Sequence, residues 1–277
     1  APATGAHSAI LIHADTGEVL YEHNADDRML IASTTKIMPA IVVLENCALD
    51  EEVEVDSRSV GAEGSSMYLK AGERYTVEDL LYGLMLVSGN DAALALAIHT
   101  AGSVEGFARL MNEKARELGM TGSHFENPHG LDAEGHYSSA RDVAAMSLAL
   151  LRHPKILEYS GIWMDTLRGG ETQLTNTNKM LKSYAGITGL KTGTTNGAGV
   201  CISASAVRDG MGLLAVVLGS PSSKERFESA TAMLDYGFAT FEAGAFPQIT
   251  GRADTLRVTG GVEQQVALDY TVPEKML

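Results

Sequence analysis

The chain has 277 residues, of which 45% are hydrophobic, with a net charge of −14 and an isoelectric point near 4.9. This length and hydrophobic fraction predict a globular protein with one large domain, or one domain plus a smaller one. The acidic balance argues against a nucleic-acid partner and offers no polybasic segment for anionic lipids. No run approaches the roughly 18 consecutive apolar residues that a membrane-spanning helix needs.

The N-terminus, Ala1-Pro2-Ala3, contains neither a Met nor a charged-then-apolar signal region. The chain therefore has the features of a mature or trimmed form. An exported protein that has lost its signal peptide would begin this way, and so would a shortened chain.

The two cysteines are predicted to be core thiols. Cys201 lies in a buried-strand type of run, residues 200–204, and Cys47 follows an apolar run at a helix end. Free cysteines are among the most buried residues, whereas a domain of this size does not need a disulfide, which is the alternative. No Cys/His cluster has metal-ligand spacing, so no metal and no cofactor is predicted.

In the first part of the chain, short apolar runs at 8–13 and 18–22 around a turn predict a β-hairpin. Pro39 falls within the first two turns of a helix that begins at Ala32, where it costs least, so a kinked helix is expected there. Asn90 or Asp91 is predicted to cap a later helix. Helices are predicted at about 32–45, 77–86, 92–101, 104–118 and 138–152.

After residue 160 the pattern changes to strands, followed by a helix over 224–242. Arg208-Asp209-Gly210 joins two apolar runs, which indicates a hairpin. Strands are predicted at 163–167, 187–194, 199–207 and 211–219. Strands joined by hairpins favour an α+β fold with an antiparallel sheet flanked by helices and a helical insertion at about 50–160.

Ser33 and Lys36 form the first of three stretches that can carry chemistry. Their spacing places both side chains on one face of the predicted helix. A serine hydroxyl is a weak nucleophile until a base takes its proton, and a lysine with a lowered pKa can be that base. Burial and the positive end of the helix dipole both favour a neutral Lys36. The alternative is an N-cap followed by a solvated lysine.

Ser88-Gly89-Asn90, the second stretch, lies between two predicted helices. In the functional interpretation, the Ser88 hydroxyl passes a proton between Lys36 and a leaving group. Asn90 then holds a substrate amide or positions Lys36. The alternative is a turn with an N-cap.

Lys191-Thr192-Gly193, the third stretch, lies on a predicted edge-like strand. Lys191 would act electrostatically, Thr192 would bind a carboxylate, and Gly193 would let a substrate backbone approach closely. The backbone N–H of Thr194, with that of Ser33, would form an oxyanion hole. The alternative is a polar strand that enters a turn.

In this order, the three stretches form the combination found in β-lactamases and penicillin-binding proteins. The chain therefore resembles the serine penicillin-recognising enzymes, and more closely the low-molecular-mass D-alanyl-D-alanine carboxypeptidases, over about residues 8–242. The further matching segments are residues 32–38, 87–93, 127–131, 191–195 with 198–199, and 235–238.

The resemblance implies a β-lactamase/transpeptidase-like fold for a catalytic domain at 1–242. It also implies a partial β-rich C-terminal domain at 243–277. The family's membrane-associating tail follows that domain, so membrane association would come only through a tail that lies outside this chain. Arg226 falls where the family has an arginine that assists carboxylate recognition; the alternative is a surface arginine. A structural role is expected for His129 and His136, because Lys36 already fills the position of the base.

The implied activity is removal of the terminal D-alanine from peptidoglycan stem peptides ending in D-Ala-D-Ala, at the extracytoplasmic face of the bacterial envelope. β-Lactams would acylate the same serine. Transpeptidation differs only in the acceptor. A non-catalytic sensor of muropeptides or β-lactams is one alternative. A β-lactamase is another, but its Glu-x-x-Leu-Asn stretch is approached only by residues 171–176, with spacing wrong by one.

Overall fold

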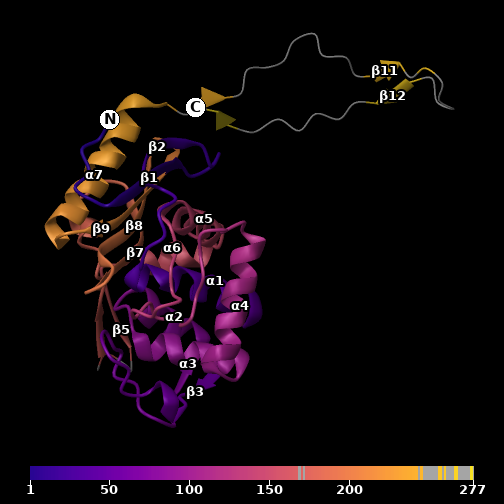
Figure 1. The fold of residues 1–277 in the computed structure, drawn as a ribbon. Coiled ribbons are helices and arrows are strands. Elements are labelled where there is room, and N and C mark those ends of the chain that lie inside the picture. The colour runs from indigo at the N-terminus through magenta and orange to yellow at the C-terminus, as the bar shows by residue number, and fades with distance from the viewer. Residues whose placement is uncertain are drawn as a thin grey trace.

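A computed structural model describes residues 1–167, 170, 172–242, 244–245, 255–257, 259, 265–267 and 275–276. Its centre is a five-stranded antiparallel sheet in the order β2-β1-β9-β8-β7. The strands are β1 (Ser8–His13), β2 (Val19–His23), β7 (Ile187–Thr195), β8 (Gly199–Arg208) and β9 (Met211–Ser220). Strands from both ends of the chain thus lie side by side, which confirms the predicted α+β fold (Figure 1).

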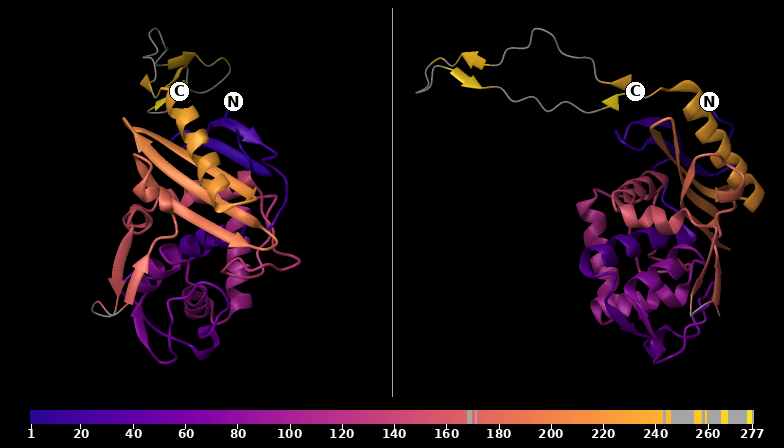
Figure 2. Two further views of the ribbon diagram at one scale, coloured as in Figure 1. Left: turned by 90° about the vertical axis from the view of Figure 1, so that its left-hand side faces the viewer. Right: turned by 180° about the vertical axis from the view of Figure 1, so that it is seen from behind.

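The sheet is buried on both faces, which explains why its central strands are almost continuously apolar. Side chains alternate along β1: Leu11 packs toward α7 (Ser223–Thr240), whereas Ile10 and Ile12 join the larger core on the other face. Figure 2 shows α7 on one face of the sheet and the helical region on the other.

The helical region lies between the two strand-forming parts of the chain. It contains α1 (Ile37–Asn46), α2 (Val77–Met85), α3 (Asn90–Ala101), α4 (Val104–Glu117), α5 (Ala140–Leu151) and α6 (Pro154–Ser160), with β3 (Glu52–Glu54) paired to β4 (Arg74–Thr76). All residues of α1 from Ile37 to Val43 are buried, which is typical of a central core helix. Pro39 occupies its third position, where the helix tolerates the missing N–H, as predicted.

Some local details differ from the predictions. The start of α3 is not capped by a side chain of Asn90 or Asp91: the N-cap is Gly89, and both residues are already helical. Asp91 instead accepts hydrogen bonds from the backbone N–H groups of Met67 and Leu69, 2.9 and 3.0 Å away. The capping prediction was wrong because these two side chains serve tertiary contacts.

Several short elements were not predicted. A 3-10 helix, η1 (Ala32–Lys36), precedes α1, and further 3-10 helices are η2 (Ser57–Ser59) and η4 (Lys179–Lys182). The predicted strand at 163–167 is confirmed as β5 (Met164–Leu167), and it pairs with a strand that was not predicted, β6 (Thr172–Thr175). Cys47 and Cys201 are both free thiols; Cys201 is buried and Cys47 is partly buried.

Beyond α7, the structure describes four short strands. β10 (Gly244–Ala245) pairs with β13 (Lys275–Met276), and β11 (Thr255–Arg257) pairs with β12 (Gln265–Ala267). The predicted β-rich domain otherwise falls outside the described residues, so its extent stays a prediction. Among the helices that the structure describes, none has both the length and the apolar character to span a bilayer.

Candidate active site

The junction of η1 and α1 brings Ser33 and Lys36 together. Lys36 Nζ donates a hydrogen bond to Ser33 Oγ across 3.0 Å. Ser33 is partly exposed, whereas Lys36 is fully buried. Ala32, the preceding residue, has a φ of +49°, a conformation that L residues rarely adopt. The tight 3-10 turn therefore presents the hydroxyl outward while it keeps the amine inside.

Lys36 is held by three acceptors. Besides Ser33, they are Asn90 Oδ1 at 2.6 Å and the backbone carbonyl of His129 at 2.7 Å. Burial, followed by the nearby positive charge of Lys191, lowers the pKa of Lys36 well below its usual value, and Asp91 opposes this shift. Lys36 can therefore lose its proton far more readily than a surface lysine, as a general base must.

Ser88 lies in the loop between α2 and α3, and Asn90, the first residue of α3, contacts the Lys36 amine. Asn90 Nδ2 donates to the carbonyl of Glu63 across 2.5 Å, which orients its Oδ1 toward Lys36. Ser88 has a φ of +61° and is almost fully buried, yet its hydroxyl has no hydrogen-bond partner among the described residues. Buried hydroxyls are rarely left unpaired, which sets Ser88 apart from the other hydroxyls near Lys36.

β7 forms the other wall of the site. It is the edge strand of the sheet, as predicted, and it lies against η1. A Cβ on Gly193 would lie 2.5 Å from the backbone nitrogen of Ser33 and 2.9 Å from that of Thr34. Only glycine allows this approach, which brings the Ser33 N–H close to the strand that carries Thr194.

Lys191 and Thr192 directly precede Gly193 on β7. Lys191 is fully buried, and burial, followed by the charge of Arg226, lowers its pKa to about 7. Its Nζ donates to the carbonyl of Thr192 across 3.0 Å. The Thr192 hydroxyl is hydrogen-bonded to that of Thr177, with 2.6 Å between the oxygens.

Arg226 reaches the same strand from the first turn of α7. Its Nη1 donates to the carbonyls of Gly193 and Cys201 across 3.3 and 3.2 Å, and its Nε is buried without a partner among the described groups. Burial lowers its pKa to about 10, so it stays charged at neutral pH. The structure thus places Arg226 behind β7 as a buried cation and not as a surface residue.

The two loop histidines, His129 and His136, lie beside the residues that form the site. His136 Nε2 and Thr35 Oγ1 are hydrogen-bonded at 2.9 Å, and His136 Nδ1 accepts from the N–H of Glu126. Burial lowers the pKa of both His129 and His136 to about 4, so both rings are neutral. The contacts of His136 agree with the structural role expected for it.

Three contributors to the site were missed in the sequence. The carbonyls of His129 and Glu63 are backbone groups, for which the sequence carries no side-chain signal. Thr177 lies in the segment after β6, outside any of the three stretches. Its neighbours Asn176 and Asn178 are buried polar residues. Two amides so close in sequence were the signal that could have pointed to this segment.

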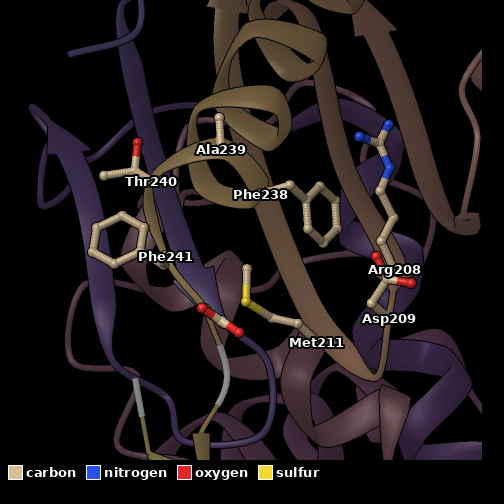
Figure 3. A pocket seen from close by; sticks show the side chains of 8 residues that line it. Arg208, Asp209, Met211, Phe238, Ala239, Thr240 and Phe241 are labelled. Carbon is tan, nitrogen blue, oxygen red and sulfur yellow. The ribbon is translucent and has the colours of Figure 1, made fainter.

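A large pocket lies elsewhere and contains none of these residues. Its volume is about 600 Å³, and it is lined by the β8–β9 turn and the end of α7. Figure 3 shows Phe238 facing Arg208, with Met211 between Phe238 and Phe241. Arg208 lies over the Phe238 ring at 4.7 Å. The described residues that line it include none of the three motif stretches, so the proposed catalytic residues lie elsewhere.

The geometry agrees with comparisons to known proteins. The sequence model of the D-alanyl-D-alanine carboxypeptidase family matches residues 1–222. The chain is 38% identical over 280 residues to the D-alanyl-D-alanine carboxypeptidase DacF of Bacillus subtilis, covering 98% of this chain and 72% of that protein. The chain belongs to this family of peptidases.

Solved structures give the same result. Penicillin-binding protein 6B of Escherichia coli superposes with a TM-score of 0.85 at 35% identity, covering 91% of this chain and 83% of that one. A penicillin-binding protein of Listeria monocytogenes in its ampicillin-bound form has a TM-score of 0.77 at 33% identity, covering 85% and 98% of the two chains. The β-lactamase/transpeptidase-like fold predicted from the sequence is therefore confirmed.

Proposed function

We propose that this protein is a serine D-alanyl-D-alanine carboxypeptidase in which Ser33 is the nucleophile. The observation that carries the proposal is the 3.0 Å contact between Ser33 Oγ and the fully buried Nζ of Lys36. A nucleophile and a base with a lowered pKa are in place before any substrate binds.

In the acylation step, Ser33 Oγ attacks the carbonyl carbon between the last two D-alanines of a stem peptide, and neutral Lys36 accepts the hydroxyl proton. The backbone N–H groups of Ser33 and Thr194 stabilise the negative oxygen of the tetrahedral intermediate. The C–N bond then breaks. The departing amine takes its proton from the Ser88 hydroxyl, which is replenished from Lys36. The unpaired Ser88 hydroxyl supports this relay.

Three residues from β7 and α7 would bind the terminal carboxylate of the substrate. Thr192 would donate a hydrogen bond, while Lys191 and Arg226 would supply positive charge. Gly193 keeps the strand open to the peptide backbone. Water, activated by Lys36, then hydrolyses the ester to release the shortened stem peptide and restore Ser33.

The same serine would be acylated by β-lactams, whose ring carbonyl takes the place of the peptide carbonyl. The ampicillin-bound relative from Listeria supports this chemistry. Because stem peptides ending in D-Ala-D-Ala belong to the cell wall, we infer that the protein works after export, at the extracytoplasmic face of the envelope.

The test is release of free D-alanine from diacetyl-Lys-D-Ala-D-Ala. The wild-type chain should release it, and Ser33→Ala should release none and take up no fluorescent penicillin. Ser57→Ala, which removes an exposed hydroxyl in η2, is the matched control and should behave as wild type. Persistent labelling of Ser33→Ala would refute the assignment of the nucleophile.

The assay also separates the alternatives. A non-catalytic sensor would bind penicillin covalently but release no D-alanine. A β-lactamase would turn over a chromogenic cephalosporin rapidly. The family assignment favours neither, and Glu171, which the second alternative would need, lies outside the described residues.

A further inference from the structure

Three metal-ligating side chains from separate segments meet at the end of α1 opposite to Lys36. Cys47 is the C-cap residue of α1, Glu51 lies just before β3, and His99 lies in the last turn of α3. One ligand atom of each lies within 4.8 Å of the others. Figure 1 shows α3 and β3 together at the end of the molecule away from both termini. The ten residues of α1 span about 15 Å, so this cluster is well separated from Lys36.

Hydrogen bonds restrain all three side chains of the cluster. His99 Nε2 lies 2.9 Å from Glu51 Oε1. The other carboxylate oxygen, Oε2, accepts from the N–H of Ala48 across 3.3 Å, which anchors the side chain and leaves Oε1 turned toward the histidine. The Cys47 thiol is hydrogen-bonded to the Thr100 hydroxyl at 3.4 Å, which holds it beside His99.

The exposure of these groups suits an ion that enters from solvent. The side chain of His99 is 21% exposed and that of Glu51 is 45% exposed. Cys47 is partly buried. An ion at their centre would therefore be reachable from water but mostly surrounded by protein. A thiolate and a carboxylate together would neutralise a divalent cation.

We propose that Cys47, Glu51 and His99 bind a zinc ion, with water as the fourth ligand. One sulfur, one imidazole nitrogen and one carboxylate oxygen are the donors that zinc accepts in tetrahedral sites, whereas magnesium and calcium prefer oxygen alone. Zinc–ligand distances of about 2.0–2.3 Å place tetrahedral ligands roughly 3.3–3.8 Å apart. The ligand atoms already lie within 4.8 Å of one another, and the 2.9 Å hydrogen bond between His99 and Glu51 would open to admit the ion.

The ion would join the C-terminal ends of α1 and α3. The opposite ends of the same two helices carry Lys36 and Asn90, which are hydrogen-bonded at 2.6 Å. A zinc ion here would thus hold together the two helices that position Lys36, the proposed base. It takes no part in the peptidase chemistry, and the proposal does not rest on that chemistry.

The experiment uses the full chain, reduced and stripped of metal with a chelator. Cobalt(II) is the spectroscopic probe, because a bound thiolate gives a ligand-to-metal charge-transfer band in the near ultraviolet. We expect one cobalt per chain with this band, loss of the band on adding zinc, and a rise in Tm of about 5 °C or more at a hundredfold excess of zinc over its Kd.

Matched variants identify the ligands. Cys47→Ala should abolish the band, and Glu51→Gln and His99→Gln should each weaken cobalt binding at least tenfold. Cys201→Ala removes the other thiol and should keep the band. Glu52→Gln removes the neighbouring carboxylate, which pairs with Arg74 on the surface, and should bind as wild type. Acylation by fluorescent penicillin checks that each variant is folded. Absence of the band in the wild-type chain, or its retention in Cys47→Ala, would overturn the proposal.

Discussion

Two lysines with lowered pKa values share the site, and the proposed mechanism needs them in opposite states. Lys36 must be neutral to accept the Ser33 proton, whereas Lys191 must be charged to attract the substrate carboxylate. Burial lowers both pKa values, and the mutual repulsion of the two lysines lowers that of Lys36 further. The order of the two pKa values therefore sets the working pH range.

A bell-shaped pH dependence of kcat/KM follows. Activity should rise with pH as Lys36 loses its proton, then fall above about pH 7 in the free enzyme as Lys191 does so. The measurement is kcat/KM for the tripeptide across pH, for the wild type and for Lys191→Arg. Because arginine keeps its charge, the variant should lose the alkaline fall. An unchanged alkaline limb in Lys191→Arg would assign that limb to another group.

Thr177 is expected to position Thr192. The hydrogen bond between their hydroxyls, at 2.6 Å, fixes the rotamer of the residue that would bind the carboxylate. Thr177→Val keeps the shape but removes this bond, which is worth about 1 kcal/mol. We expect KM to rise roughly 3- to 10-fold with kcat nearly unchanged.

The control for Thr177 is Thr188→Val on β7. Its hydroxyl is bonded to that of Ser205 at 2.8 Å, so the variant loses an equivalent bond between β7 and β8. Its KM should stay at the wild-type value. If both variants change KM alike, the effect of Thr177 is general loosening of β7.

At the scale of elements, the site depends on how closely β7 approaches η1. Gly193→Ala would place a methyl group 2.5 Å from the Ser33 nitrogen, so one of the two elements must move. This displaces a proposed oxyanion-hole donor, and removal of such a donor costs roughly 100-fold or more in rate. We expect acylation by penicillin to slow by that factor while Tm falls only slightly, because the edge strand can shift outward.

Gly212→Ala on β9 is the comparison for this change. Its added Cβ would meet the Ala14 side chain at 3.2 Å and that of Val207 at 4.0 Å, away from Ser33. Acylation should stay at the wild-type rate. A normal acylation rate in Gly193→Ala would show that the close approach is not needed for catalysis.

The elements also show how much the sequence could predict. The sheet strands and the longer helices could be predicted from apolar periodicity, because their buried side chains recur at strand or helix spacing. Turn residues such as Asp209-Gly210 marked where strands end. β6 was missed since a four-residue strand in which only Leu174 is buried gives almost no alternation. The three motif stretches supplied the side chains that we propose to react. The carbonyl of His129, however, reaches Lys36 across 93 positions of sequence, and only the fold brings them together.

The same reason explains why the sequence did not indicate the proposed zinc ligands. Cys47 and Glu51 have no histidine nearby in sequence, and His99 comes from a different helix. Spacing rules detect ligands on one local segment. The packing of α1 against α3 creates this cluster, so no spacing rule applies.

At the scale of the whole molecule, the end of the catalytic domain at residue 242 is still a prediction. The family match ends at residue 222, yet α7 supplies Arg226 to the site and Ala230, Met233 and Leu234 to the core on one face of the sheet. Phe241 still packs against that core and contacts the Tyr236 ring. We therefore propose that the catalytic domain ends just after Phe241 and that 243–277 belongs to a separate β-rich unit.

A chain shortened to residues 1–242 tests this boundary. It retains both cores and every proposed site residue, so it should fold, be acylated by penicillin at the full-length rate, and unfold within roughly 2 °C of the full chain's catalytic transition. A chain ending at residue 222 is the control: without α7 the inner face of β9, including Leu213 and Val217, is exposed, and it should not fold. Aggregation of the 1–242 chain, or loss of its acylation, would mean that residues 243–277 complete the catalytic fold.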